Sequence, residues 1–173
     1  VEYFKKRKFT FFQSELNTRL LFIEGQIYQK ANEYEQATKC FKKTARRAGD
    51  YEMQFASNLN IAMCYDPKKS SSKSIISRLN KMAEDKKNVE YRDQVYYALG
   101  EVYFRDKNVD KACTQWEESV HLSTTNKQQK ITSALRAADT YFSLLEKYEK
   151  AQMYYDTALA VMPKDYPNRA NIE

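Results

Sequence analysis

The stretch 97–116, YALGEVYFRDKNVDKACTQW, decides the fold because it repeats an earlier part of the chain. Aligned with 22–41, FIEGQIYQKANEYEQATKCF, it places Gly100 on Gly25 and Trp116 on Phe41, each pair 75 residues apart. At the same offset, Tyr103 falls on Tyr28 and Ala112 falls on Ala37. A fixed offset of this kind predicts structural units stacked in an array rather than a single globule.

Two further stretches follow the same pattern less closely. The matching positions are Ala62 and Tyr65 in 59–79, and Ala138, Tyr141, Ala151, Tyr155 and Pro163 in 137–163. We therefore expect one array over 1–173, with units at about 14–48, 51–85, 89–122 and 126–161. The turn of the second unit, PKKSSSKS, departs most from the pattern, and that of the fourth is about one residue longer.

Each unit predicts two helices joined by a short turn, and three glycines with three prolines argue against a turn-rich β protein. The expected helices are 14–30, 33–48, 51–65, 72–85, 89–106, 109–122, 126–145 and 148–161. The expected N-cap side chains are Asn32, Asp50, Asn88, Asn108 and Asn126. Glu35 would complete a capping box with Asn32, and Gly49 would end the second helix in a left-handed conformation.

The glycines inside the helices need a reason, because glycine in a helix costs roughly 1 kcal/mol relative to alanine. We expect Gly25 and Gly100 to face the small Ala37 and Ala112 of the partner helix. Ala62 and Ala138 take the same position in the other units, opposite Ile75 and Ala151. Close packing would offset the cost, so Gly100→Leu should lower stability by about 1–3 kcal/mol.

Charge is uneven along the chain: residues 1–87 carry a net +8 and residues 88–173 a net −2, within a total of +6. The clusters Lys5–Lys8 and Lys42–Arg47 make the first half a candidate docking surface for an acidic peptide segment, with a solvated helix face as the alternative. Glu33, Glu35 and Glu52 interrupt these clusters, and no zinc-finger or RNP-type motif occurs, so nucleic acid is not an expected partner.

Targeting features are also absent from the sequence. No stretch approaches the roughly 18 apolar residues of a membrane span, and the start does not resemble a signal peptide. The chain does not begin with Met, which favours a segment of a longer protein.

The residues that could carry chemistry do not form a catalytic, metal or cofactor site. Cys40, Cys64 and Cys113 lie on apolar helical stretches without C-x-x-C spacing, which predicts small buried thiols, with one reactive thiol as the alternative. His121 has no second ligand near it in sequence. Ser70 and Lys73 form S-x-x-K without the companion motifs, and no phosphate-binding glycine loop occurs. We predict a protein that is not an enzyme and binds no cofactor.

The order of a small residue, an aromatic three later, alanine nine further on, a large aromatic four beyond and a closing proline resembles the tetratricopeptide repeat. The resemblance implies an all-α, right-handed superhelical solenoid whose first helices line a concave, protein-binding groove. A mere spacer between functional ends is the alternative. The groove positions of the repeat correspond to Arg19, Gln26, Gln29, Asn60, Met63, Gln94, Tyr97, Glu101, Arg136 and Asp139.

A narrower resemblance covers nearly the whole chain. The strings YEM at 51–53, DQVYYALGE at 93–101 and YYDTALAVMPKDYP at 154–167 are similar to the central repeats of a Bacteroidota tetratricopeptide-repeat lipoprotein family. That family acts in type IX secretion and gliding motility. The resemblance implies an outer-membrane lipoprotein facing the periplasm, a scaffold linking periplasmic components to the outer-membrane translocon. The alternatives are a cytoplasmic adaptor for peptide segments and a regulatory repeat domain of a larger enzyme.

Overall fold

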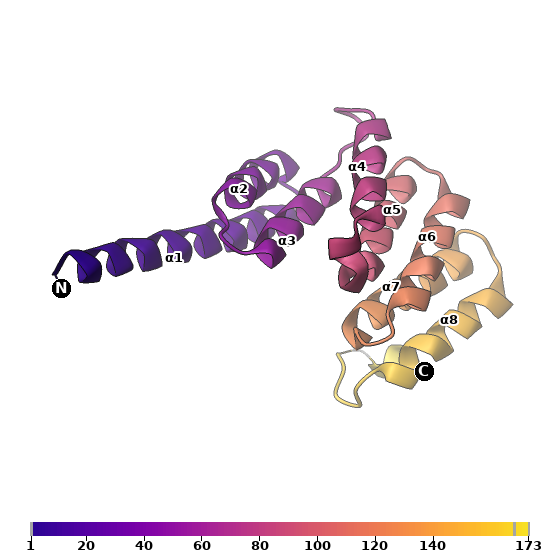
Figure 1. Ribbon diagram of the computed structural model, residues 1–173. Helices are drawn as coiled ribbons and strands as arrows, with labels where there is room; N and C mark the ends of the chain where they lie inside the picture. The colour runs from indigo at the N-terminus through magenta and orange to yellow at the C-terminus, as the bar shows by residue number, and fades with distance from the viewer. Residues whose placement is uncertain (1, 168, 173) are drawn as a thin grey trace. The chain divides into compact units, whose positions relative to one another are not determined.

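The structure, a computed structural model, describes the backbone of residues 2–167 and 169–172 and the side chains of 13–167, 169, 170 and 172. The described backbone contains eight α-helices, two 3₁₀ helices and no strand (Figure 1), which confirms the all-α prediction. The α-helices are α1 (Glu2–Lys30), α2 (Tyr34–Arg47), α3 (Tyr51–Met63), α4 (Lys73–Glu84), α5 (Arg92–Arg105), α6 (Val109–Leu122), α7 (Lys127–Ser143) and α8 (Tyr148–Val161). The 3₁₀ helices are η1 (Lys86–Tyr91) and η2 (Arg169–Asn171). Among the described residues, none of these helices combines the length and apolar character needed to cross a membrane.

Helices α2 to α8 begin and end within a few residues of the predicted bounds. The exception is α1, which begins at Glu2 rather than at the predicted residue 14. The longer helix has a simple cause, because no glycine or proline occurs before Gly25. The Lys5–Lys8 cluster therefore belongs to α1, but its side chains lie outside the described residues.

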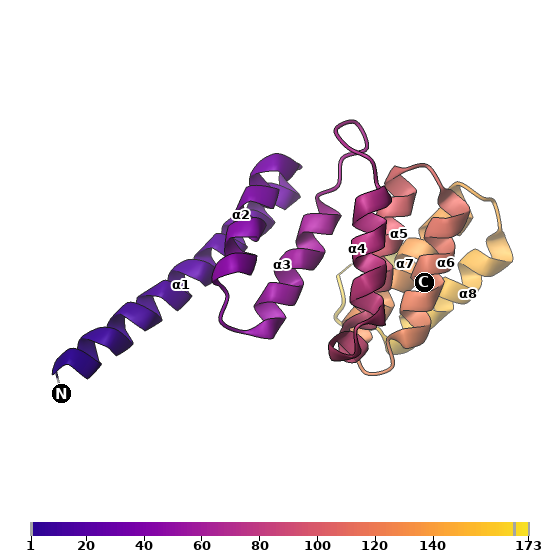
Figure 2. The ribbon, with the colours of Figure 1, turned by 45° about the horizontal axis from the view of Figure 1, so that its top comes forward.

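The chain divides into two compact units, Val1–Ser70 and Ser71–Glu173. In the first unit, α1 packs against α2 and α2 packs against α3. In the second unit, each α-helix packs against the next along the chain, and η1 packs against α4 and α5 (Figure 2). The division falls inside the predicted second repeat, between α3 and α4. The single array over 1–173 stays a prediction.

The two helical glycines lie beneath aromatic rings. A Cβ added to Gly100 would overlap the indole of Trp116, and one added to Gly25 would come within 2.8 Å of Cε1 of Phe41. The predicted neighbours, Ala112 and Ala37, are therefore not the atoms that the glycines meet first, and that expectation was wrong. The aromatic residue stands one helical turn beyond the alanine, and its ring is large enough to reach the first helix.

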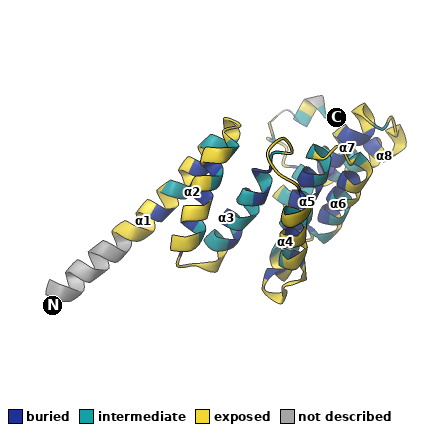
Figure 3. Ribbon diagram, turned by 90° about the horizontal axis from the view of Figure 1, so that it is seen from above, coloured by how far each residue is buried: buried dark blue, intermediate teal, exposed yellow. Residues whose placement is uncertain are grey.

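These aromatic residues form the centres of the hydrophobic cores (Figure 3). Phe41 and Trp116 are both fully buried, and Phe22 packs edge-on against Phe41 with ring centroids 5.5 Å apart. The other buried repeat positions are Gly25, Ala37, Ala62, Tyr65, Gly100, Ala112, Ala138, Tyr141 and Ala151. Tyr28, Tyr103 and Tyr155 are half-buried, and Pro163 is exposed.

The turns within three helix pairs share one backbone conformation. Each has a non-glycine residue in the left-handed region, namely Asn32, Lys107 and Glu146, with φ of 60°, 60° and 52°. In each turn a backbone N–H reaches back into the preceding helix, from Glu33 to Tyr28 O, from Asn108 to Tyr103 O and from Lys147 to Tyr141 O, all at 2.9 Å. These bonds satisfy carbonyls at the helix C-terminus. The third spans six residues rather than five, which confirms the longer turn predicted for the fourth unit.

The capping predictions hold for three helices. The Asp50 carboxylate accepts from Met53 N at 2.6 Å, the Asn126 side chain accepts from Gln129 N at 3.1 Å, and the Asn108 side chain accepts from Lys111 N at 3.4 Å. A side-chain oxygen that accepts a free N–H at a helix start typically contributes about 1 kcal/mol.

The other cap predictions were wrong. Asn32 is the left-handed turn residue and accepts from the Tyr34 hydroxyl, so the predicted capping box does not form. Glu35 instead pairs with Lys39 at 3.0 Å and Lys69 at 3.6 Å, which hold the pKa of its carboxyl below the ordinary value. Asn88 lies in η1 and donates to Met82 O at 2.8 Å, because α5 begins only at Arg92. Gly49 does not have a positive φ.

We predict that Gly100→Ala lowers the free energy of unfolding by about 1–3 kcal/mol, because the added methyl group displaces the Trp116 ring. Helix propensity alone would give a change of opposite sign, a gain of about 1 kcal/mol. Gly25→Ala should cost less than about 1 kcal/mol, since the ring of Phe41 needs to move only slightly. Gly49→Ala is the matched control, because a Cβ there meets nothing within 4 Å. Urea denaturation measures all three, and an unchanged midpoint for Gly100→Ala would contradict this packing account.

We predict that Lys107→Gly raises the free energy of unfolding by about 0.5–1 kcal/mol. The left-handed conformation costs an L-residue roughly 1–2 kcal/mol, and glycine's greater freedom in the unfolded chain cancels part of the gain. Lys107→Ala keeps the backbone strain and removes the side chain, so it should match the parent protein in thermal and urea denaturation. Equal stability of the glycine and alanine variants would show that the turn is not strained.

Candidate protein-binding surface

The predicted groove residues of the second unit come from α5 and α7, the first helices of the third and fourth repeats. They are Gln94, Tyr97 and Glu101 from α5, and Arg136 and Asp139 from α7. We call this set the α5–α7 surface. Its members differ in exposure: Glu101 is buried, Asp139 is exposed and the other three are intermediate.

An ion pair joins the two helices of this surface. Arg136 Nε donates to Glu101 Oε1 at 2.7 Å, and the two side chains are 32% and 11% exposed. The same guanidinium lies over the rings of Phe104 and Trp116, 4.4 and 5.0 Å from their centroids. A cation over an aromatic face is attracted by the ring's quadrupole. Arg136 is therefore tied to its own protein by two kinds of contact, which the prediction of a partner-facing arginine did not include.

Tyr97 lies beside this pair. It packs against the core cluster that contains Trp116 and Tyr141. Burial, with a smaller contribution from the Glu101 carboxylate, raises the pKa of its hydroxyl to about 12. The structure thus brings Tyr97, Glu101 and Arg136 together as predicted neighbours. A half-buried tyrosine with an anchored ring is the type of side chain that often carries binding energy at interfaces.

Asp139 is held from α8. Its Oδ1 accepts from the Tyr155 hydroxyl at 2.7 Å, and burial together with this hydrogen bond raises the pKa of Tyr155 to about 12. The carboxylate is exposed and therefore remains accessible to a partner. Tyr155, which the sequence predicted only as a repeat position, thus also orients a predicted groove residue.

In the first unit, the predicted groove residues lie on α1 and α3. Arg19 pairs with Glu15 of its own helix at 2.9 Å, and the Asn60 side chain donates to Ala56 O at 2.8 Å. Gln26 is exposed, and Gln29 and Met63 are half-buried. Arg19 and Asn60 are therefore each held by a contact within their own helix.

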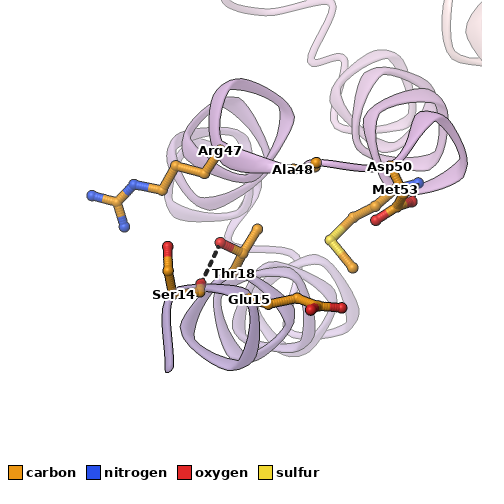
Figure 4. Close-up of a pocket in the computed structure, with 8 residues that line it drawn as sticks. Ser14, Glu15, Thr18, Arg47, Ala48, Asp50 and Met53 are labelled. Atoms are coloured by element: carbon orange, nitrogen blue, oxygen red, sulfur yellow. Dashed lines mark hydrogen bonds between the residues drawn. The ribbon is translucent and has the colours of Figure 1, made fainter. Parts of the chain in front are cut away.

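A pocket of about 210 Å³ lies in the first unit (Figure 4). Its lining residues are Ser14, Glu15 and Thr18 of α1, Arg47, Ala48, Gly49 and Asp50 around the end of α2, and Met53 of α3. The Thr18 hydroxyl donates to Ser14 O at 2.9 Å. Small-molecule sites typically have about 300–1,000 Å³, so this pocket suits a single side chain of a partner better than a cofactor. Gly49, which has no side chain to fill the space, is the sequence signal for it.

A buried polar cluster links α5, α6 and α7. The carboxylate of Asp93 accepts from the Ser123 hydroxyl at 3.1 Å, and the Ser119 hydroxyl donates to Asp93 O at 2.6 Å. Ser119 and Ser133 share a hydrogen bond of 2.7 Å. Serine beside aspartate suggests hydrolase chemistry, but His121 is exposed while this cluster is buried. The cluster therefore lacks the histidine base of a catalytic triad and has a structural role between helices. The sequence analysis missed it.

Comparison with protein families now gives the assignment. The tetratricopeptide repeat matches residues 91–164, which cover α5 to α8, and residues 18–52, which cover α2 and most of α1. The chain is a tetratricopeptide-repeat protein. The stretch 53–90 lies in neither match and contains the degenerate PKKSSSKS turn. Comparison with curated proteins gave no match.

The family fixes the broad role. Tetratricopeptide repeats are protein-interaction modules and are typically not catalytic, so this tetratricopeptide-repeat chain is a protein–protein interaction scaffold. The prediction of an all-α tetratricopeptide-type array is confirmed at the level of the fold class.

We predict a coupling energy of about 1–2 kcal/mol between Glu101 and Arg136. Arg136→Met alone should destabilise the protein by about 1–3 kcal/mol, because it leaves a mostly buried carboxylate without its cation. The double variant Glu101→Leu/Arg136→Met removes both charges and should recover much of that loss. Urea denaturation of the two single variants and the double variant closes the cycle. Additive losses would show that the two charges do not interact.

Proposed function

We propose that this tetratricopeptide-repeat protein is a scaffold segment of the type IX secretion and gliding-motility machinery. In this proposal it belongs to a lipoprotein at the periplasmic face of the outer membrane and links periplasmic components to the outer-membrane translocon. Support for the machinery comes from the sequence strings at 51–53, 93–101 and 154–167. Support for the binding role comes from one geometric observation, the α5–α7 surface.

The α5–α7 surface favours a partner segment that crosses two repeats. Tyr97 offers a ring anchored in the core, and Asp139 offers an exposed carboxylate on the neighbouring first helix. The Glu101–Arg136 pair between them is already satisfied, so it fixes the spacing of α5 and α7 rather than supplying a charge to the partner. Tyr97 and Gln94 are therefore better tests of binding than Arg136, whose removal also disturbs the fold.

The cysteines are compatible with an oxidising compartment such as the periplasm. Cys40, Cys64 and Cys113 are 8%, 6% and 1% exposed. Burial raises the pKa of Cys113 to about 11, and burial with the nearby Glu24 carboxylate raises that of Cys40. Because the thiolate is the reactive form, these two thiols are poor nucleophiles at neutral pH. Buried, protonated thiols therefore persist where an exposed cysteine would be oxidised.

We predict that the folded protein resists thiol modification. Ellman's reagent at neutral pH should react slowly with the native protein and rapidly with all three cysteines in guanidinium chloride, because reaction requires an exposed thiolate. Gly100→Ala, which loosens the core around Trp116, should speed the reaction of Cys113. Rapid stoichiometric labelling of the native protein would contradict the burial argument and weaken the assignment to an oxidising compartment.

The function is tested by affinity capture with the 173-residue chain as bait. Solubilised Bacteroidota envelope and cytoplasm are used separately, and bound proteins are identified by mass. Enrichment of outer-membrane secretion components from the envelope supports the proposal. Capture of cytoplasmic proteins alone would contradict it and favour the cytoplasmic adaptor.

Matched variants then locate the contact. Gln94→Ala/Tyr97→Ala changes the α5–α7 surface and should weaken capture at least tenfold, a loss of about 1.4 kcal/mol. Thr114→Ala/Gln152→Ala changes exposed residues of the second helices and should leave capture unchanged. Equal capture by both variants would place the partner on another surface, even if the secretion machinery is the partner.

A further inference from the structure

Helix α1 has an exposed apolar stripe. Leu16, Leu20, Ile23 and Ile27 are 42%, 54%, 49% and 63% exposed. At 100° per residue, these four side chains lie roughly 140–200° around the helix from Gly25. Gly25 is the residue that meets Phe41 of α2. Helix α1 is therefore apolar on two opposite faces, of which one is packed against α2 and the other is open.

The second unit shows what this face does in a first helix. At the offset of 75 residues, Leu20, Ile23 and Ile27 correspond to Val95, Ala98 and Val102 of α5. Those three residues are 0%, 0% and 1% exposed. Helix α5 packs against α6 on one side and also against α4. The equivalent face is thus a helix-docking face within this chain, and α1 carries larger apolar residues there.

The spacing of the stripe is that of a two-stranded coiled coil. Steps of four, three and four residues place Leu16 and Ile23 at d positions and Leu20 and Ile27 at a positions of a heptad. An identical stripe on another copy would be self-complementary, as a two-fold symmetric interface requires. The face opposite α2 also leaves room for a helix without disturbing the α1–α2 pair.

Charges on the two edges of the stripe select the orientation. Arg19 takes the g position on one edge and Glu24 takes the e position on the other. In a parallel pair of helices, a g residue meets the e′ residue five positions further along the partner. Arg19 of each copy would then meet Glu24 of the other, which gives two opposite-charge contacts. In an antiparallel pair Arg19 would meet Gln26 instead, without that gain.

From these observations we propose that α1 binds α1 of a second copy as a parallel, in-register pair through Leu16, Leu20, Ile23 and Ile27. Arg19 now pairs with Glu15 of its own helix, but both side chains are largely exposed, at 61% and 45%. Exposed pairs of this kind are weak, so Arg19 can exchange Glu15 for the partner's Glu24. The inference concerns self-association and does not depend on the proposed secretion role.

The first test is oligomeric state. Sedimentation equilibrium of the 173-residue chain should show a reversible monomer–dimer equilibrium at micromolar concentration. Ile23→Lys should raise the dimer dissociation constant more than a hundredfold, because it introduces a charge in the centre of the stripe. Met153→Lys is the control, since Met153 is 50% exposed on α8 and lies outside the stripe. A monomer at all concentrations, or a dimer that Ile23→Lys leaves intact, would overturn the proposal.

The second test is a charge exchange. Arg19→Glu and Glu24→Arg each bring like charges together in a parallel pair and should raise the dissociation constant about tenfold. The double variant Arg19→Glu/Glu24→Arg restores opposite charges and should return to within about threefold of the parent. Thermal unfolding of each variant controls for the effect of Glu24 on the neighbouring Cys40. Additive weakening in the double variant would overturn the parallel arrangement.

The third test fixes the register. Leu20→Cys should form an intermolecular disulfide under mild oxidation, because a positions face each other in a parallel, in-register pair. In an antiparallel pair Leu20 would lie opposite Ile23, so Leu20→Cys alone would not cross-link efficiently, whereas a mixture of Leu20→Cys and Ile23→Cys would. Efficient cross-linking of the mixture alone would overturn the proposal.

Discussion

The contact between Gly100 and Trp116 organises the second unit. The indole occupies the space that any other residue would fill with a Cβ, so α5 and α6 approach closely enough to bury Trp116 completely. Arg136 lies over the same ring and reaches Glu101, the residue that follows the glycine. One missing methyl group thus connects α5, α6 and α7 through a single chain of contacts. Within the part of the chain that the structure describes, Trp116 Nε1 has no hydrogen-bond partner, which indicates that packing governs the choice of this residue.

Periodic features were predictable from the sequence because packing imposes them on every repeat. The offset of 75 residues located the helices and the longer turn of the fourth unit. Caps were less predictable, because an asparagine amide can bond to many partners. The offset itself aligns Asn32 with Lys107, the left-handed residue, and not with the cap Asn108; applying it consistently would have corrected this error. The early start of α1 was missed because no sequence signal marks it.

The binding surface was only partly predictable, for a related reason. A repeat pattern assigns positions within one unit, whereas the Glu101–Arg136 bond joins residues of successive units, 35 positions apart. The pattern therefore named both residues but treated them as independent contacts for a partner. The Asp93, Ser119 and Ser133 cluster also crosses units and was missed for the same reason. Which residues occupy a surface follows from the repeat, but which of them are already paired follows only from the packing of neighbouring units.

The open stripe of α1 separates two contributions that are usually mixed at an interface. Fully burying a leucine or isoleucine contributes about 1.5–3 kcal/mol, so four half-exposed side chains can supply several kcal/mol of affinity in any orientation of a second helix. A hydrophobic stripe alone does not distinguish parallel from antiparallel packing. Surface charges contribute little to affinity but can determine orientation and partner choice. Arg19 and Glu24, on opposite edges of one stripe, therefore determine the orientation, while Leu16, Leu20, Ile23 and Ile27 determine the strength.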